Sequence, residues 1–288
     1  MILNFRLGRI EVIGALGCEE RSALQRAASR ALPSHGIAPE TTNGWRIERR
    51  TARGDRQILD FPLERLTVIC CDFDMDEGEW RRLLRATCQR LMMTAGHLCL
   101  HAVVARLHGK TFAIAGGHGT GKSSLGALLH EQGGELLSGD FTVIGWPSPS
   151  QACALAGTHP LLLRSGDYPP PNLRDPRLKA GTAVTIEAPA QLTTILYLEN
   201  NQRGSESARM ESPPISRRTL NDLYLNASTG FDQTLERFRY PLGVLNSDSD
   251  QRTRFTLIEQ LMHQVRTIRA RGSSQYLANL LTGATQHD

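Results

Sequence analysis

The stretch FAIAGGHGTGKSSLGALLHEQG, residues 112–133, decides the fold of this chain. Its middle, Gly116-Gly117-His118-Gly119-Thr120-Gly121-Lys122-Ser123, fits the pattern G-x-x-x-x-G-K-[ST] without a gap. The apolar run before this loop predicts a strand, and the apolar spacing after it predicts a helix. The sequence therefore predicts a strand, glycine loop and helix of the kind that binds phosphate groups in P-loop proteins.

Each part of the loop has an expected role toward a nucleotide. Glycines allow the backbone N–H groups to turn toward an anion, and the positive end of the following helix adds to the attraction. The Lys122 ammonium is expected to bridge β- and γ-phosphate oxygens, and the Ser123 hydroxyl to bind Mg²⁺. The predicted nucleotide contacts are Gly116, Gly117, His118, Gly119, Thr120, Gly121, Lys122, Ser123 and Ser124.

A P-loop also needs an acidic side chain near its metal, and the sequence offers two candidates. Asp140 follows Ser123 by 17 residues, in a compact arrangement in which the helix returns at once to a strand. Glu199 follows Ser123 by 76 residues and ends an apolar strand, which is the spacing of an ordinary P-loop ATPase. Spacing alone leaves both open.

Composition excludes several classes of protein. Of the 288 residues, 40% are hydrophobic and 22% charged, which predicts an ordinary folded core. The net charge of +4, without a dense basic stripe, argues against a nucleic-acid partner. No apolar run reaches the ~18 residues of a membrane span. The six cysteines form no C-x-x-C pair, so we expect free thiols and a cytoplasmic protein.

Periodicity predicts an α/β chain with two domains. Residues 1–96 form a smaller N-terminal α+β domain, with helices expected over 19–32 and 76–93. Residues 97–288 form the nucleotide-binding domain, with single strands expected over 98–107 and 135–146. Loops are expected over 165–181 and 200–216. The C-terminal part reads as mostly helical, with one long helix over 255–272 whose apolar face comprises Phe255, Ile258, Leu261, Met262, Val265 and Ile268.

The stretch from Leu100 to Ile144 resembles the catalytic core of the HPr kinase/phosphorylase family. The matching features are the Leu100-His101 pair, the P-loop fifteen residues after His101, and the return through EQGGELLSGD to an acid. The smaller HPr-kinase-like proteins, some of which modify ribosomally made peptides, are more similar still. The resemblance implies an HPr-kinase-like P-loop core with a mixed sheet, related to that of phosphoenolpyruvate carboxykinases.

The resemblance also implies roles for individual residues. His101 corresponds to an active-site histidine near the transferred phosphate, and Asp140 to the second acid of a pair near Mg²⁺ or the attacking hydroxyl. The chain departs from the family at two positions: Gly139 replaces the first acid, and Ser124 replaces the glutamate after the P-loop serine. The implied catalytic residues are His101, Lys122 and Asp140, and the implied metal ligands are Ser123 and Asp140.

The expected reaction is ATP- and Mg²⁺-dependent phosphorylation of a serine or threonine hydroxyl on a small protein or peptide. The loops over 165–181 and 200–216 could flank such an acceptor, and relatives that form rings or dimers make a homo-oligomer an expectation. Three alternatives stay open: a nucleotide-binding regulator without transfer activity, a P-loop ATPase that uses Glu199, and a small-molecule kinase.

Overall fold

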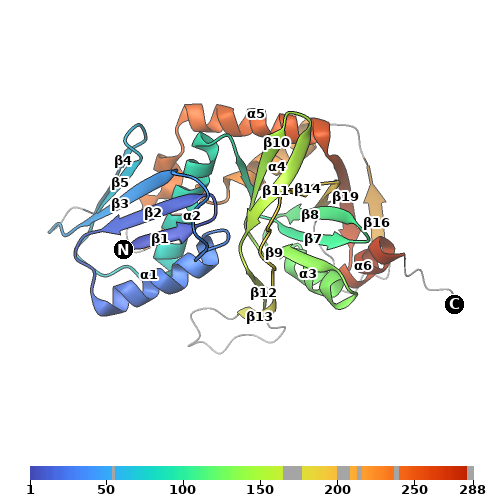
Figure 1. Ribbon diagram of the computed structural model, residues 1–288, viewed down its shortest axis with the longest axis horizontal. Coiled ribbons are helices and arrows are strands. Elements are labelled where there is room, and N and C mark those ends of the chain that lie inside the picture. The colour runs from blue at the N-terminus through green and yellow to red at the C-terminus, as the bar shows by residue number, and fades with distance from the viewer. Residues whose placement is uncertain (54–55, 165–176, 200–207, 213–215, 237–239, 284–288) are drawn as a thin grey trace. The chain divides into compact units, whose positions relative to one another are not determined.

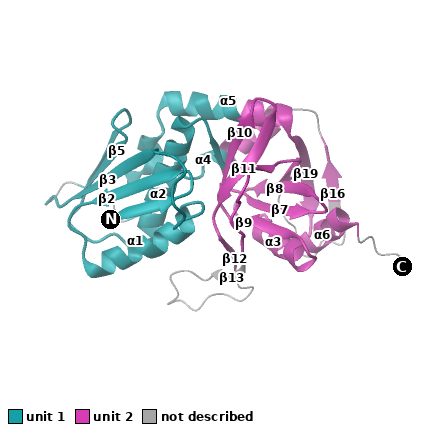
Figure 2. Ribbon diagram, in the orientation of Figure 1, with its two compact units in different colours: residues 1–99, 227–257 teal, residues 100–226, 258–288 magenta. Residues whose placement is uncertain are grey.

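The computed structural model describes residues 1–53, 56–164, 177–199, 208–212, 216–236 and 240–283, which form a mixed α/β fold (Figure 1). The chain divides into two compact units (Figure 2). One unit contains Met1–Cys99 and Ala227–Leu257, and the other contains Leu100–Asn226 and Ile258–Asp288. Residues Ala227–Leu257, which the sequence analysis assigns to the second domain, thus belong to the first unit.

The first unit is built on a five-stranded mixed sheet with the order β1-β2-β3-β5-β4. Helices α1 (Cys18–Ala31) and α2 (Glu77–Thr94) pack against each other, which confirms the two helices predicted here. Asp76 caps α2 by accepting from the Glu79 backbone N–H at 2.9 Å. The strands are β1 (Ile2–Phe5), β2 (Gly8–Ile13), β3 (Gly44–Arg50), β4 (Gln57–Phe61) and β5 (Leu66–Cys70).

A buried arginine connects the segment Ala227–Leu257 to the rest of the first unit. Arg90 on α2 pairs with Asp60 on β4 and, at 3.0 Å, with Asp250. Because Arg90 is only 2% exposed, losing either carboxylate would leave a poorly compensated buried cation. The elements of the later segment are β17 (Thr234–Leu235), β18 (Tyr240–Pro241), the 3₁₀ helix η1 (Leu242–Leu245) and the start of α5 (Asp248–Gln264).

The second unit contains a six-stranded mixed sheet with the order β16-β19-β15-β8-β7-β9. Helices α3 (Lys122–Glu131) and α6 (Ser274–Thr282) pack together, and both contribute to the core on one face of this sheet. The strands are β7 (Val103–Leu107), β8 (Lys110–Gly116), β9 (Glu135–Ser138), β15 (Thr194–Leu198), β16 (Ala208–Glu211) and β19 (Arg266–Gly272). The core residues from the central strands and the two helices include Val103, Ile114, Leu125, Leu129, Leu196, Leu198 and Leu277.

The chain crosses twice between this sheet and a four-stranded sheet with the order β14-β11-β10-β6. Each segment predicted as one strand, 98–107 and 135–146, is in fact two strands. The first breaks at His101 and Ala102, and the second breaks over residues 139–141. The further strands are β6 (Leu98–Leu100), β10 (Thr142–Ser148), β11 (Gln151–Gly157), β14 (Ala190–Gln191), and the separate pair β12 (Pro160–Arg164) and β13 (Arg177–Thr182).

The predicted long helix over 255–272 is wrong for residues 265–272, whereas Ser274–Thr282 is helical (α6), as expected for a mostly helical C-terminal part. Helix α5 ends at Gln264, and Arg266–Gly272 forms strand β19 inside the six-stranded sheet. The β-branched Val265, Thr267 and Ile268 favour a strand, and pairing with β15 overrides the helical spacing. The predicted loops also contain strands, since β13 covers 177–182 and β16 covers 208–211. The remainder of those loops lies largely outside the described residues.

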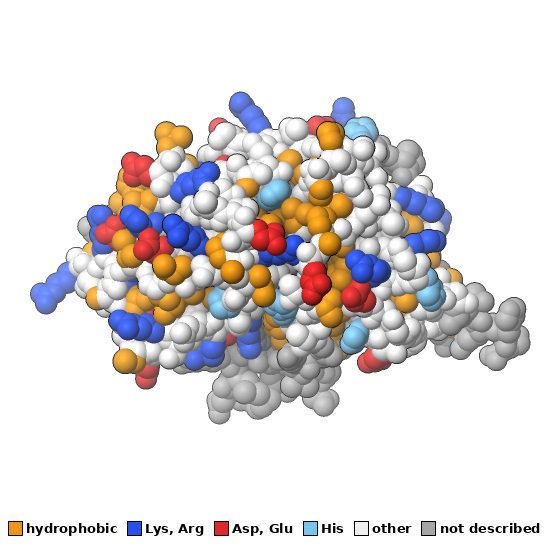
Figure 3. Space-filling view, in the orientation of Figure 1, with side chains coloured by type: hydrophobic (Ala, Val, Ile, Leu, Met, Phe, Trp, Pro, Cys, Tyr) orange, Lys and Arg blue, Asp and Glu red, His pale blue; other side chains and the backbone are white. Residues whose placement is uncertain are grey.

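The surface charges and the cysteines are as the amino-acid composition predicts. On the face shown in Figure 3, basic and acidic side chains are interspersed. Arg46 and Glu11 form one exposed pair of opposite charge in the first unit, at 3.0 Å. All six cysteines are free, and five of them are buried, which confirms the predicted thiols. Among the described residues, no helix combines the length and the apolar character needed to traverse a bilayer.

Candidate nucleotide site

The glycine loop lies between the end of β8 and the start of α3, in the second unit. Gly116 has φ 148°, and a Cβ there would lie 2.6 Å from the Leu198 carbonyl oxygen and 2.7 Å from Thr120 Oγ1. Gly119 and Gly121 also have positive φ, a region that other residues rarely adopt. Gly121 is the N-cap of α3 and offers no side-chain cap, which leaves the first N–H groups of the helix available to an anion.

Lys122 is buried at the start of α3 and faces back into the loop. Its Nζ donates to the carbonyl oxygens of Gly116, at 3.0 Å, and Gly117, at 2.8 Å. Burial lowers the pKa of the Lys122 ammonium to about 8, although the nearby Asp140 carboxylate acts in the opposite direction. A phosphate in the loop would supply the negative charge that this buried cation lacks.

His101 and Asp140 form a pair at the two crossings between the sheets. The distance between His101 Nε2 and Asp140 Oδ1 is 2.8 Å, with His101 buried and Asp140 partly exposed. The hydroxyl of Thr142 donates to the Ala102 carbonyl oxygen at 3.0 Å and so joins the same two corners. The interruption of both strands therefore brings together two residues that are 39 positions apart in the sequence.

Asn226, near the end of α4 (Arg217–Ser228), links the glycine loop to the chain at His101, where β6 and β7 are separated; this break is called the His101 corner. Its Oδ1 accepts from the His101 backbone N–H at 3.1 Å. Its Nδ2 donates to the His101 carbonyl oxygen at 3.0 Å and to the Gly116 carbonyl oxygen at 3.2 Å. The amide thus pairs the backbone groups that His101 exposes where its strand breaks. Sequence reasoning missed this residue, because a lone asparagine on a helix 110 positions after the loop carries no motif.

The remaining predicted loop residues lie on either side of Lys122 in the sequence. The His118 ring is exposed, and its centroid lies 5.1 Å from that of His101. Thr120 Oγ1 donates to the Gly117 carbonyl oxygen at 3.0 Å. Ser123 is half-buried and Ser124 is exposed. The loop, His101 and Asp140 therefore form one neighbourhood within the second unit.

Gly139 stands where the resemblance implies a first acid, and its surroundings leave no room for a side chain. A Cβ at Gly139 would lie 2.2 Å from the Pro160 carbonyl oxygen and 2.5 Å from the Pro160 carbonyl carbon. The Gly139 N–H also donates to the Thr158 carbonyl oxygen at 2.8 Å, which holds the two segments together. The side chain of an acid at position 139 would therefore collide with the Pro160 backbone as it lies in this structure.

Glu199, the other candidate acid, follows β15 and is held by arginines. It pairs with Arg269 and Arg271 on β19 and with Arg218 on α4 at 3.1 Å. Burial raises the pKa of the Glu199 carboxyl, but the hydrogen bonds from Arg271 and Arg269 outweigh burial and hold the pKa below its ordinary value. This network occupies the carboxylate, whereas Asp140 is the acid whose charge acts on Lys122.

Comparison with known proteins adds little. No family model matches the chain, and no curated protein matches it. Among solved structures, the chain is similar to the HPr(Ser) kinase/phosphatase from Coxiella burnetii, with 12% identity and a TM-score of 0.26. The match covers 40% of this chain and 72% of that chain. A likeness this low does not establish a shared fold or activity.

Proposed function

We propose that this protein is an ATP-dependent kinase that phosphorylates a serine or threonine hydroxyl on a small protein or peptide. The observation that carries the proposal is the His101–Asp140 pair beside the buried Lys122 of a complete glycine loop. A phosphate cradle with one positioned acid meets the main needs of phosphoryl transfer, which depends on positioning and charge neutralisation more than on strong base chemistry.

In this proposal, Asp140 and His101 have different roles. Asp140 accepts the proton of the attacking hydroxyl while the hydroxyl oxygen bonds to the γ-phosphorus and the bond to the β–γ bridging oxygen breaks. ADP leaves, and the acceptor carries the phosphoryl group. His101 Nε2 donates to Asp140 Oδ1 and fixes the orientation of the carboxylate. Lys122 neutralises charge that develops on the transferred group.

The loop fits a nucleotide better than it fits a preformed metal site. Among the described residues, no group of three or more His, Cys, Asp or Glu side chains is arranged to hold a metal ion. Mg²⁺ prefers oxygen ligands and usually keeps several waters beside substrate phosphates. The Ser123 hydroxyl and the Asp140 carboxylate are the oxygen groups of this chain that would hold Mg²⁺, which supplies charge neutralisation at the phosphates.

The test is transfer to candidate acceptors, with variants that separate binding from chemistry. The purified protein, ATP and Mg²⁺ are incubated with short peptides encoded beside its gene, and products are read by mass spectrometry. Lys122→Ala and Asp140→Asn are the test variants. Glu135→Gln is the matched control, because among the described residues this carboxylate on β9 forms just one exposed pair, with Arg106. Labelling that persists in the control and disappears in both test variants supports the proposal.

A nucleotide-binding regulator without transfer activity is the second candidate. The observation that favours it is the exclusion of any side chain at Gly139. Saturable ATP binding that requires Lys122, with no labelled acceptor and no phosphate release, would support this candidate and overturn the kinase. Steady phosphate release without an acceptor, abolished in Glu199→Gln, would instead identify an ATPase.

A further inference from the structure

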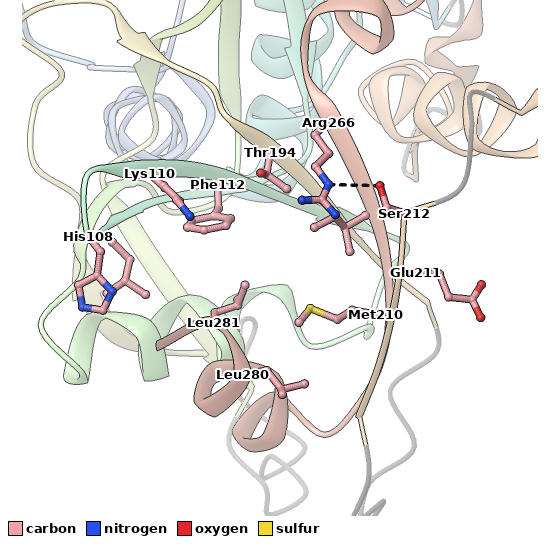
Figure 4. A pocket seen from close by; sticks show the side chains of 12 residues that line it. His108, Lys110, Phe112, Thr194, Met210, Glu211, Ser212, Arg266, Leu280 and Leu281 are labelled. Carbon is pink, nitrogen blue, oxygen red and sulfur yellow. Dashed lines mark hydrogen bonds between the residues drawn. The ribbon is translucent and has the colours of Figure 1, made fainter. Parts of the chain in front are cut away.

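A cavity lies in the second unit, at the end of β8 opposite to the glycine loop. Its volume is about 430 Å³, and it is lined where β8, β15 and β19 begin (Figure 4). The loop follows the other end of β8, at Gly116. The cavity is therefore separate from the candidate nucleotide site, and an inference about it does not depend on the proposed kinase activity.

Half of the lining is apolar. Phe112, which is 7% exposed, forms the sheet side of the cavity, and Leu280 on α6 remains 41% exposed at its mouth. Exposed leucine beside a buried aromatic ring leaves apolar surface that a ligand could cover. The apolar lining residues are Leu107, Phe112, Met210, Ile268, Leu280 and Leu281.

Two cations face this apolar lining. The Arg266 side chain extends toward the cavity, and its Nε donates to Ser212 Oγ at 3.2 Å (Figure 4). Lys110 lies at the start of β8, beside Phe112. Within the described part of the chain, neither cation pairs with a carboxylate. Glu211 also lines the cavity, but its carboxylate points away from it in Figure 4 and pairs with Arg209 at 2.5 Å.

We propose that this cavity binds an amphipathic organic anion, a small molecule with an apolar body and one carboxylate or similar group. The volume falls in the range of small-molecule sites, which combine apolar walls with a few placed polar groups. Arg266 has two further guanidinium nitrogens for a bidentate contact with a carboxylate, and Lys110 adds a second positive charge. The apolar body would cover Phe112 and the α6 leucines.

The probe for this chemistry is 8-anilinonaphthalene-1-sulfonate, which joins an aromatic body to one anionic group and fluoresces when it leaves water. Its affinity for the full-length folded protein is measured by titration. The test variants are Arg266→Gln and Leu280→Asp, the second of which places a carboxylate at the exposed mouth. The control is Arg217→Gln, an exposed arginine on α4 that does not line the cavity. Decanoate and decanol, which share an apolar chain, are used as competitors.

We expect saturable binding, weakened about tenfold or more in both test variants, since a charge-assisted contact contributes roughly 1.5–3 kcal/mol. The control variant binds as the unmodified protein does, and decanoate displaces the probe more strongly than decanol. Far-UV circular dichroism must match between variants, because partly unfolded chains also bind this probe. Unchanged affinity in both variants, no saturable binding, or equal displacement by decanol would overturn the proposal.

Discussion

His101 Nε2 lies 2.8 Å from Asp140 Oδ1, and each residue stands where the chain leaves one sheet for another. The histidine follows β6 and precedes β7, while the aspartate follows β9 and precedes β10. Because strand pairing stops at both places, the side chains there are directed by the crossings rather than by the pleat of a strand. The pair is thus a product of sheet topology.

Replacing His101 tests whether it positions Asp140. In the proposed kinase, His101→Phe removes the donor to the carboxylate and is expected to lower kcat about 10- to 100-fold, the equivalent of a charge-assisted hydrogen bond. His101→Gln, which retains an N–H donor, should recover part of the loss. Nucleotide affinity should stay within a factor of a few in both variants. A loss of affinity equal to the loss of kcat would contradict a positioning role.

The pKa of Lys122 predicts how nucleotide binding depends on pH. Burial lowers this pKa to about 8, and the phosphates bind the protonated form. Below pH 8 the cation is present and affinity is constant, whereas above pH 8 binding takes up a proton. The apparent Kd should then rise by about tenfold per pH unit. Isothermal titration in buffers of different ionisation enthalpy measures both the affinity and the proton uptake.

Lys122→Arg is the control for this pH dependence. A guanidinium stays charged throughout the range, so its binding curve should be flat above pH 8 even if the affinity is lower. An equally steep pH dependence in this variant would show that another group titrates.

Gly139→Ala is expected to destabilise the protein. The new Cβ would meet backbone atoms of Pro160 at 2.2 and 2.5 Å, and backbone cannot move aside as a flexible side chain can. The expected loss is roughly 1–3 kcal/mol in the free energy of unfolding, measured with urea. Gly117→Ala is the matched control, since a Cβ there meets only Thr120 Cγ2 at 3.7 Å. Equal stability of the two variants would show that the chain can accommodate a Cβ at position 139.

Asn226→Ala removes three hydrogen bonds between α4, the His101 corner and the glycine loop. The expected loss of unfolding free energy is roughly 2–4 kcal/mol, because buried backbone groups lose their partners. Nucleotide affinity should also fall, since Gly116 is one of those partners. Asn221→Ala, at an exposed position on the same helix, should change neither quantity. Unchanged nucleotide affinity in Asn226→Ala would separate the residue from the loop.

Glu199→Gln tests a structural role against a catalytic one. The arginines hold the pKa of the Glu199 carboxyl below its ordinary 4.5, so its stabilising effect is present above pH 4.5 and is lost as pH falls through the lower, folded value. The variant should therefore be less stable than the unmodified protein at pH 7, and the difference should shrink in acid. Phosphate release by the remaining folded protein should not depend on Glu199.

The strand, glycine loop and first-unit helices could be predicted because local patterns determine them. The capped start of α2 and the loop glycines each have a signal within a few residues. The division of 98–107 and 135–146 into strands of different sheets could not be predicted. A continuous apolar run does not show where a strand stops pairing with one sheet and starts pairing with another. Asn226 and the arginines around Glu199 were equally inaccessible, since their partners lie far away in the sequence. Residues 265–272 have helical spacing, but Arg266–Gly272 forms strand β19 because it pairs with β15.

The interleaving of the two units has a consequence during synthesis. A ribosome releases residues 1–99 first, then most of the other unit, and only afterwards the segment 227–257 that supplies Asp250 to Arg90. Domains that are continuous in sequence can fold one after another as they emerge. Here the first unit remains incomplete until most of the second unit has been translated, so the nascent chain depends on residues 227–257 to complete the unit that contains residues 1–99.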